Sequence, residues 1–426
     1  MIDLKKLRDA PDEFKASAAR RDPDLVSRLD AILELDHQRR AVLREVEALK
    51  ASRNKASFEV AQRKKAGDDA SDLLAELKTA SAKIKDHDQR LHDIEQELTH
   101  QQLRIPNPPL ASVPTGDASA NQEIRTWGEP RTFSFEPKPH WDIGQSLGIL
   151  DLAGGAKVAG KGFPVYVGLG SKLVRGLINF MLDLHTNEHG YVEVWPPALI
   201  NEASARGTGQ LPDLANDMYV TEDGLFLTPT AEVPVTNLHR DDTLAIGQLP
   251  LGYAAYTPCF RREAGAHGKE TRGITRVHQF DKVELVCFCT PESSGEELER
   301  LLGHAEMVLQ RLELPYRVLA LATGELGFAS AKTYDLEAWA AGMNTWLEVS
   351  SASVFTDFQA RRANIRYRPK AGAKPDFVHT LNASGLALPR TIIALLENNQ
   401  MEDGTVRIPE ALVPYLGVER LTPDAR

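Results

Sequence analysis

The chain has 426 residues, of which 42% are hydrophobic and 26% are charged, and its formal net charge is −10. This length predicts about two or three domains, and the acidic balance argues against a protein coated in positive charge, so an RNA partner would need a local basic patch. The three cysteines, Cys259, Cys287 and Cys289, include no C-x-x-C pair, which argues against a disulfide framework or a zinc site. A signal-peptide core and an apolar run of bilayer length are both missing, so we expect a cytoplasmic protein without a membrane partner.

Residues 25–103 predict two long helices, because they contain almost no glycine or proline and are rich in Ala, Leu, Glu, Lys and Arg. The second predicted helix repeats apolar residues every seven positions, at Leu77, Ile84, Leu91 and Leu98. The first has a similar spacing, which Asp36 and Arg39 interrupt. Gly67 predicts a helix end, so we expect the two helices to fold back as an antiparallel coiled-coil arm over about residues 27–98.

Basic residues gather on the first of these helices. Residues 38–65 hold nine Lys or Arg against three Glu, whereas residues 68–98 have the opposite bias. One edge of the arm is therefore positive within an acidic chain. Two interpretations stay open: a solvated coiled coil whose helices attract each other by charge, or an RNA-binding edge.

A proline-rich linker, RIPNPPLASVP at residues 104–114, ends the second helix and marks a domain boundary. Beyond it, short β-rich runs stand between single amphipathic helices, and several runs are separated by hairpin-sized gaps. Regular strand-helix alternation, which a parallel sheet requires, is missing. An α+β fold is therefore predicted, with the arm followed by an antiparallel β-sheet flanked by helices.

GAKVAGKG, at residues 155–162, nearly matches a phosphate-binding loop. Gly162 stands where such a loop has the hydroxyl that binds Mg²⁺, and the next segment, GFPVYVGLG, predicts a strand where a helix should begin. A P-loop ATPase is therefore disfavoured, and turns are the expected role of these glycines.

Residues 260–284, FRREAGAHGKETRGITRVHQFDKVE, alternate cations and anions around a glycine-rich tip. In an extended strand Arg261 and Glu263 share one face. On the other flank even steps separate Arg276, His278, Phe280 and Glu284. Two arginines, two glutamates and an aromatic ring on one sheet face suit a nucleotide, although a solvated charged hairpin explains this stretch equally well.

Further polar clusters come at the ends of predicted strands, in LTPTAEVPV, TWLEVSSAS and LNASGLALPRTIIALLENNQ. They contain Thr230, Glu232, Glu348, Ser350, Ser351, Asn382, Ser384 and Arg390. Any one cluster alone is more typical of a structural or solvated group. Their combination and order are more specific.

In that order, the segments resemble the catalytic domain of class II aminoacyl-tRNA synthetases. Residues 173–200, which contain Pro196 and Pro197, resemble the first motif of that class, which forms the dimer interface. We therefore expect a second copy to meet this segment, whose helix has an apolar face at Leu173, Leu177, Phe180 and Met181. TPCFRREAG and TRGITRVHQFDKVELV together resemble the second motif, and LNASGLALPRTIIALLENNQ resembles the third. With the arm, essentially the whole chain resembles seryl-tRNA synthetases of bacterial type. Ala383 stands where glycine is expected and Ala352 where cysteine is common, which affects the shape of the substrate pocket rather than the reaction.

The resemblance implies an ATP-dependent ligase that activates L-serine to seryl-adenylate and transfers serine to tRNA(Ser); charging of tRNA(Sec) stays open. The implied cofactors are ATP and Mg²⁺, and the implied assembly is a homodimer. The implied domains are a tRNA-binding domain over residues 1–103, the linker, and a catalytic domain over residues 115–426. Because the attacking carboxylate is already anionic, catalysis should need positioning and cationic charge rather than a general base.

The resemblance also implies roles for single residues. Arg261 would hold the α-phosphate, Arg276 and Arg390 the distal phosphates, and Phe280 would stack on adenine. The implied ATP-binding set is Arg261, Arg262, Glu263, Val277, Phe280, Glu348, Val349, Ser350 and Ser351. The implied serine-binding set is Thr230, Ala231, Glu232, Glu284 and Ser384. Glu348 and Ser351 would hold Mg²⁺, and Arg39, Arg40 and Arg44 would contact tRNA.

Three other functions remain as alternatives to a seryl-tRNA synthetase. A class II synthetase of neighbouring specificity should carry an anticodon-binding domain after the third motif, yet this chain ends about 26 residues beyond Gln400. An amino-acid activating enzyme that loads a carrier protein would lack the arm. A catalytically dead coiled-coil RNA-binding protein would not be expected to keep Arg261, Glu263, Glu348 and Arg390.

Overall fold

The structure is a computed structural model that describes residues 1–264 and 272–423, so part of the glycine-rich tip of residues 260–284 lies outside the described residues. The chain divides into two compact units. One is Ile2–Pro106, called here the helical unit. The other is Asn107–Arg426 together with Met1, called here the sheet unit.

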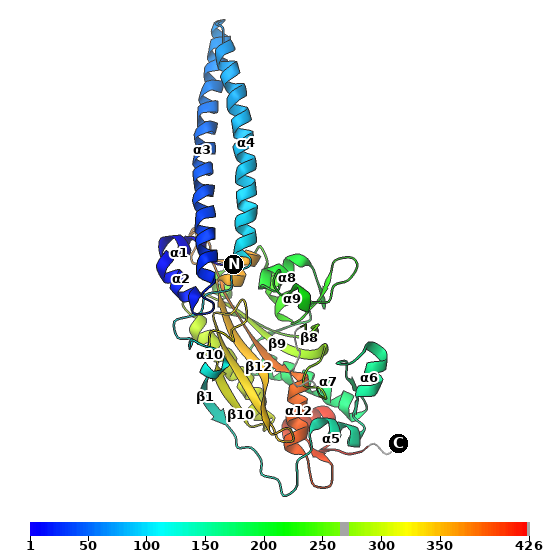
Figure 1. The fold of residues 1–426 in the computed structure, drawn as a ribbon. Coiled ribbons are helices and arrows are strands. Elements are labelled where there is room, and N and C mark those ends of the chain that lie inside the picture. Colours follow the sequence, from blue (N-terminus) through cyan, green and yellow to red (C-terminus); the bar gives the residue numbers. More distant parts are fainter. Residues whose placement is uncertain (265–271, 424–426) are drawn as a thin grey trace. The chain divides into compact units, whose positions relative to one another are not determined.

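The helical unit consists of α1 (Leu4–Asp9), α2 (Pro11–Ala19), α3 (Leu25–Ala66) and α4 (Ser71–Gln102). The long helices α3 and α4 lie side by side and run in opposite directions (Figure 1). At 1.5 Å per residue, α3 is on the order of 60 Å long. It ends at Gly67, whose left-handed φ of 83° lets the Asp68 N–H turn back to the Arg63 carbonyl at 2.9 Å. The predicted antiparallel arm is confirmed.

The two helices bury a narrow apolar seam. Its members are Leu29, Ile32, Val42, Val46 and Val60 on α3, and Leu73, Ile84 and Leu98 on α4. Asp36, which was expected to interrupt the seam, is instead only 2% exposed. Its two carboxylate oxygens accept from Arg8 of α1 and from Arg39, each at 3.0 Å. This interruption is therefore a buried ion-paired link between α1 and α3.

The sheet unit is built on an eight-stranded sheet with the order β1-β10-β11-β12-β15-β9-β8-β4. The strands are β1 (Gln122–Trp127), β10 (Tyr316–Ala320), β11 (Lys332–Ala340), β12 (Thr345–Thr356), β15 (His379–Ala387), β9 (Gln279–Cys289), β8 (Leu251–Phe260) and β4 (Val192–Val194). All neighbours pair antiparallel except the short edge strand β4, which runs parallel to β8. The predicted antiparallel core is confirmed.

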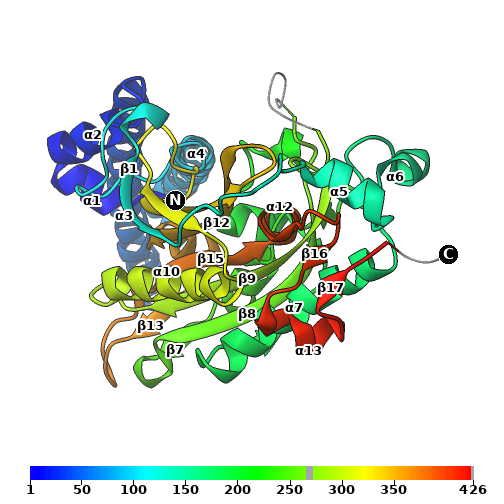
Figure 2. The same ribbon diagram turned by 90° about the horizontal axis from the view of Figure 1, so that it is seen from below.

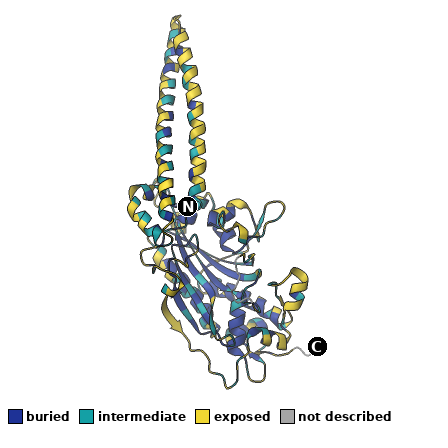
Figure 3. Ribbon diagram, viewed as in Figure 1, coloured by how far each residue is buried: buried dark blue, intermediate teal, exposed yellow. Residues whose placement is uncertain are grey.

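Helices α7 (Leu169–Asn187), α10 (Ser294–Arg311) and α12 (Leu388–Asn399) cover one face of this sheet and form the main hydrophobic core with it (Figure 2). Central strands such as β9 and β15 are largely buried, whereas the edge strand β1 is exposed along its length (Figure 3). Helices α9 (Glu232–Thr236) and α11 (Phe358–Ala363) pack on part of the opposite face. The strand period of two gives the two faces different chemistry, because Val283 and Leu285 of β9 enter the main core while Lys282 and Glu284 face the other way.

Smaller elements complete the sheet unit. They are α5 (His140–Leu147), β2 (Leu150–Asp151), α6 (Leu152–Ala159), β3 (Val165–Tyr166), β5 (Leu199–Ile200), α8 (Glu202–Thr208), β6 (Phe226–Leu227), β7 (Thr243–Ala245), β13 (Arg366–Arg368), β14 (Asp376–Phe377), β16 (Val406–Arg407), α13 (Val413–Leu416), β17 (Arg420–Leu421) and the short 3₁₀ turns Ala118–Ala120, Ala215–Asp217, Asn237–His239, Ile246–Gln248 and Glu410–Leu412.

Two local predictions about strands were wrong. LTPTAEVPV is not a strand past Leu227, because Pro229 and Pro234 have no N–H for a ladder, and α9 begins at Glu232 instead. In the charged segment, β8 ends at Phe260 and Glu263 has a left-handed φ of 51°. Arg261 and Glu263 are therefore brought together by a turn, not by the alternation of a strand.

Two further expectations also need correction. The apolar face of α7 that was expected to meet a second copy, formed by Leu173, Leu177, Phe180 and Met181, is buried in the core of the same subunit. In GAKVAGKG the first glycine, Gly155, lies inside α6, whereas Gly160 and Gly162 have positive φ and do turn the chain, as expected.

Candidate active site

Two adjoining cavities open on the polar face of the sheet. The first has a volume of about 350 Å³ and is bordered by α9, β12, β15 and the loop before α9. The second, of about 180 Å³, lies between the second and third motifs. Both linings include Arg261, Lys282, Glu348 and Ser384. Two ligands placed in these cavities would therefore meet at a cation-rich junction.

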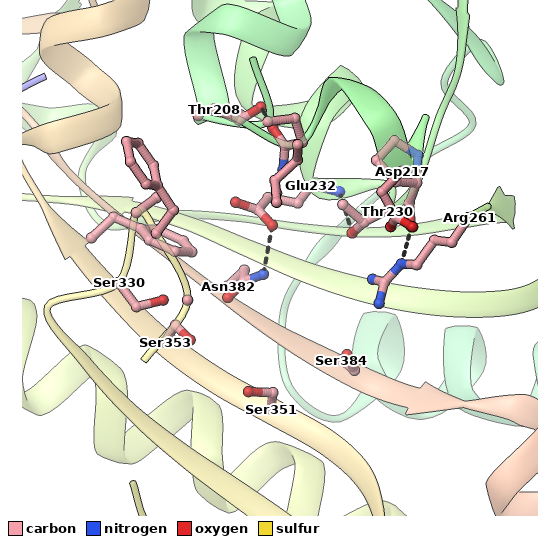
Figure 4. Close-up of a pocket in the computed structure, with 18 of the residues that line it drawn as sticks. Thr208, Asp217, Thr230, Glu232, Arg261, Ser330, Ser351, Ser353, Asn382 and Ser384 are labelled. Carbon is pink, nitrogen blue, oxygen red and sulfur yellow. Dashed lines mark hydrogen bonds between the residues drawn. The ribbon is translucent and has the colours of Figure 1, made fainter. Parts of the chain in front are cut away.

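Buried charges form a connected network in the first cavity. Asn382 donates to both carboxylates, at 2.9 Å to Glu232 Oε2 and 3.0 Å to Glu284 Oε1 (Figure 4 shows the Glu232 bond). Lys282 Nζ lies 2.5 Å from Glu284 Oε2 and donates to Thr230 Oγ1 at 2.9 Å. Apart from this ion pair, Glu284 Oε2 accepts no hydrogen bond within the part of the chain that is described. Lys282 therefore balances Glu284, while Glu232 is held by neutral amide donors.

The charge balance of this cavity favours a cationic ligand. Within the network two carboxylates face one ammonium group, and Gln359 donates to Glu232 Oε1 at 2.5 Å. The rest of the lining adds the carboxylates of Asp217 and Glu348 and the guanidinium of Arg261. Burial, together with the nearby charge of Glu284, raises the pKa of Glu232 to about 7. A ligand ammonium would supply the second positive charge and favour the ionised form of Glu232.

Three arginines line or border the second cavity. The Arg261 guanidinium lies 5.4 Å from the centre of the Phe280 ring, and Arg276 forms an ion pair with Glu263. Arg390, in the first turn of α12, donates to the Glu348 carbonyl at 2.8 Å and forms an ion pair with its carboxylate at 3.3 Å. Guanidinium forks around the partly buried ring of Phe280 fit a planar group that carries phosphates.

A β-bulge in β12 shapes the wall between the cavities. Ser350 pairs with Leu336 and Glu348 with Glu337, so Val349 has no partner across the ladder. This extra residue lets Glu348 and Ser351 line the same cavity although they are three positions apart. The bulge also turns Ser350 away, and its hydroxyl donates to the Ser384 carbonyl at 2.6 Å.

Glu348 and Ser351 offer oxygen atoms to a hard cation. Ser351 donates to Asp335 Oδ1 at 2.7 Å, and burial together with the charge of Glu348 raises the pKa of Asp335. No group of three or more His, Cys, Asp or Glu side chains among residues 1–264 and 272–423 could hold a metal alone. Mg²⁺ fits this wall if phosphate oxygens supply its other ligands.

Most predicted site residues line these cavities. The first cavity has Thr230, Glu232, Arg261, Glu348, Ser351 and Ser384, and the second has Arg261, Glu263, Arg276, Val277, Phe280, Glu348, Val349, Ser384 and Arg390. Glu284 reaches the first through Asn382. The side chains of Ala231, Arg262 and Ser350 are in neither lining.

The sequence reasoning missed Gln359 and Lys282 of the network and assigned no role to Asn382. Lys282 stands at an even step between Phe280 and Glu284, so the same strand alternation would have placed it on the polar face. Asn382 was noted beside Ser384 without a role, and its contacts with both glutamates could not be read from the sequence.

The basic residues of the arm fall into two groups. Several bind acidic residues of the other helix: Lys50 with Asp88 at 3.0 Å, Arg63 with Asp72 at 2.9 Å and Arg39 with Glu95 at 3.7 Å. The attraction between helices that was one interpretation of the charge bias is thus present. Arg40 and Arg44 are exposed, and Arg44 Nε donates to the Arg40 carbonyl at 3.2 Å.

The central part of the sheet unit matches the core domain of class II aminoacyl-tRNA synthetases. The family model described as the tRNA synthetase class II core domain (G, H, P, S and T) matches residues 219–399. The model of the seryl-tRNA synthetase N-terminal domain matches residues 1–109.

Relatives that match over nearly their full length identify the family within this class. Serine–tRNA ligase of Gemmatimonas aurantiaca is 56% identical over 98% of this chain and 99% of its own length, and that of Nitratidesulfovibrio vulgaris is 53% identical over the full length of both. The seryl-tRNA synthetase of Pyrococcus horikoshii, solved in complex with ATP, is 38% identical over 100% of both chains with a TM-score of 0.94. The chain belongs to the seryl-tRNA synthetase family, which confirms the resemblance seen in the sequence.

The structure also bears on membranes. Within the described ranges, no helix has both the length and the apolar character needed to cross a bilayer.

Proposed function

We propose that this chain activates L-serine with ATP and transfers the seryl group to tRNA(Ser). The observation that carries this function is the pair of adjoining cavities, one with a network for a small zwitterion and one with arginines around an aromatic ring. Full-length identity above 50% to serine–tRNA ligases favours serine over the neighbouring specificities and over a carrier-protein substrate.

Serine would occupy the first cavity. Its ammonium would bind Glu232 and Glu284, whose Oε2 also pairs with Lys282, and its hydroxyl would bind Thr230 or Ser384. The backbone around Ala231 would complete this side. Because these polar groups are buried, alanine would leave them without partners, which a site built around hydrogen bonds rejects strongly.

ATP would occupy the second cavity, with adenine against Phe280 and its amino group near Glu263. An oxygen of the serine carboxylate would attack the α-phosphorus, and the bond from that phosphorus to the pyrophosphate oxygen would break. Arg261, at the junction of the cavities, is placed to neutralise charge at the α-phosphate, with Arg276 and Arg390 toward the distal phosphates. Arg262, Val349 and Ser350 belong to the same proposed binding segment.

Mg²⁺ would be held by Glu348 and Ser351, where it would neutralise phosphate charge. Glu348 would then exchange its ion pair with Arg390 for the metal, which would free the guanidinium for the nucleotide.

The helical unit is proposed to bind tRNA(Ser) through the exposed side of α3, including Arg40 and Arg44. The domain roles follow: residues 1–103 would bind tRNA, residues 104–114 would form the linker, and residues 115–426 would form the catalytic domain.

A cytoplasmic homodimer is proposed as well. Two exposed apolar residues, Val192 in the edge strand β4 at 54% and Trp195 directly after it at 73%, supply a surface for a second copy.

ATP–pyrophosphate exchange, measured with each standard amino acid in turn, tests the proposed function. We expect strong exchange with serine and Mg²⁺ only. Comparable exchange with threonine, or none with serine, would contradict it.

A further inference from the structure

A histidine and a glutamate are fully buried outside the linings of both cavities. His140 begins α5, Glu397 lies in α12, and both side chains are 0% exposed. Glu397 Oε1 accepts from the backbone N and from Nδ1 of His140, both at 2.9 Å. Its Oε2 accepts from the backbone N of Gly342 and Met343, at 2.9 and 3.0 Å. The carboxylate thus fixes the start of α5 and the β11–β12 turn to α12.

These contacts define the proton position on the His140 ring. Nδ1 donates to a carboxylate, so in the neutral ring Nε2 is the acceptor. Nε2 lies 3.1 Å from the backbone N of Ile274 and accepts its N–H. Since Ile274 is 0% exposed, no solvent can replace this acceptor for the Ile274 N–H.

Ile274 belongs to the limb of residues 272–277, which leads into β9. Gly273 has a left-handed φ of 68°, and a Cβ there would lie 2.0 Å from His140 Nε2. The Arg272 guanidinium lies 4.4 Å from the centre of the Trp141 ring. Three consecutive residues of the limb are therefore held by the first two residues of α5.

The same limb is also held from α12. Arg390 and Glu397 are seven residues apart and lie on one side of that helix. Arg390 Nε donates to the Thr275 carbonyl at 3.3 Å, while Glu397 reaches Ile274 through His140. The next two residues of the limb, Arg276 and Val277, line the second cavity.

We propose that His140 is a positioning residue for ATP: its Nε2 holds the limb of residues 272–277 so that Arg276 and Val277 face the nucleotide. This inference rests on the proposed function, because it takes the second cavity as the ATP site. His140 touches neither substrate. Its loss therefore affects nucleotide binding and leaves the serine network, on β9, β15 and α9, in place.

Two substitutions separate the two sides of the ring. His140→Asn keeps an amide donor near the position of Nδ1, toward Glu397, but has no acceptor that reaches Ile274. His140→Gln extends its side-chain carbonyl to the position of Nε2. Loss of a buried hydrogen bond predicts about a five- to tenfold higher KM for ATP in His140→Asn, with KM for serine within about twofold. His140→Gln should restore KM for ATP to within about twofold of the wild type.

Gly273→Ala disturbs the same hydrogen bond from the limb, because its Cβ would lie 2.0 Å from His140 Nε2 and the left-handed φ of 68° disfavours alanine. It should raise KM for ATP in the same way. Melting temperatures with and without ATP report binding of the nucleotide independently of turnover. Both His140→Asn and Gly273→Ala should therefore show a smaller ATP-induced shift than the wild type.

The outcomes distinguish this inference from the proposed function. Wild-type protein without serine-dependent exchange would refute the proposed function, whereas normal wild-type exchange with an unchanged KM for ATP in His140→Asn would refute the role of His140. Equal losses toward ATP and serine in both His140 variants, in step with their melting temperatures, would show a purely structural residue. Should His140→Asn fail to fold, Gly273→Ala decides, and a normal KM for ATP in it would overturn the inference.

Discussion

The helical unit and the sheet unit use charge in different ways. On the arm, ion pairs such as Lys50–Asp88 lie on exposed helix surfaces, where a single pair contributes about 0–1 kcal/mol. In the sheet unit, Glu232, Lys282 and Glu284 are buried and each has several partners. Removing one member there leaves another charge uncompensated, which is far more costly. Exposed charges of the arm can therefore vary with little structural effect, whereas the buried Asp36 with its partner Arg39 and the charges of the active site cannot.

The largest effect is expected from the site. Arg261→Ala should abolish adenylate formation while the protein stays folded, because the guanidinium lines both cavities and is only partly buried. Removing one charge-assisted interaction with the transition state costs about 3 kcal/mol or more, on the order of a hundredfold in rate. Arg311→Ala, which breaks an exposed ion pair with Glu188, is the matched control for pyrophosphate exchange. Near-normal exchange by Arg261→Ala would remove this arginine from the site.

A smaller effect should follow pH. Because the pKa of Glu232 is raised to about 7, the carboxyl is protonated below that pH and ionised above it. Only the ionised form attracts the serine ammonium, so KM for serine should rise by up to about tenfold for each pH unit below 7. Exchange assays at pH 6 and 8 measure this ratio. Glu232→Gln should bind serine weakly at both pH values. If this variant kept the wild-type pH dependence of KM for serine, the titrating group would be a residue other than Glu232.

The mildest effect is expected on the arm. Arg40→Gln with Arg44→Gln should weaken tRNA(Ser) binding and lower its salt dependence by about 0.7–0.9 in log-log slope for each phosphate that is no longer neutralised. Arg39 is left intact, because it binds the buried Asp36 and its loss would disturb the arm itself. Lys50→Gln, whose Nζ already pairs with Asp88, is the control and should change binding less. The measurement is the affinity for tRNA(Ser) at several salt concentrations. Equal log-log slopes for the double variant and for Lys50→Gln would argue that this side of α3 does not bind tRNA.

The sequence predicted the features that repeat or alternate. Seven-residue spacing gave the arm, hairpin-sized gaps gave the antiparallel sheet, and the order of three motifs gave the arginines of the second cavity. It did not predict the bulge at Val349, because one extra residue in a ladder leaves no compositional mark. Nor did it predict the burial of Asp36 or the His140–Glu397 pair, since their partners are 28 and 257 residues away along the chain.

Two wrong predictions have a common physical reason. Thr230 and Glu232 were expected in a strand, yet nearby prolines stop a ladder and start α9. The apolar face of α7 was read as a contact with a second copy, yet a helix that covers a sheet needs the same pattern for its own core. In both cases a local pattern fitted two structures, and tertiary packing decided between them.

We assign serine activation to the sheet unit and tRNA recognition to the helical unit. Shortening the arm tests this assignment most directly. Replacing residues 44–91 by a short glycine-rich turn keeps the Arg8–Asp36–Arg39 link and the seam at Leu98. Serine-dependent pyrophosphate exchange and charging of tRNA(Ser) are then measured on the same preparation. We predict near-normal exchange and a collapse of charging. Undiminished charging by the shortened protein would contradict the account and would show that the sheet unit recognises tRNA by itself.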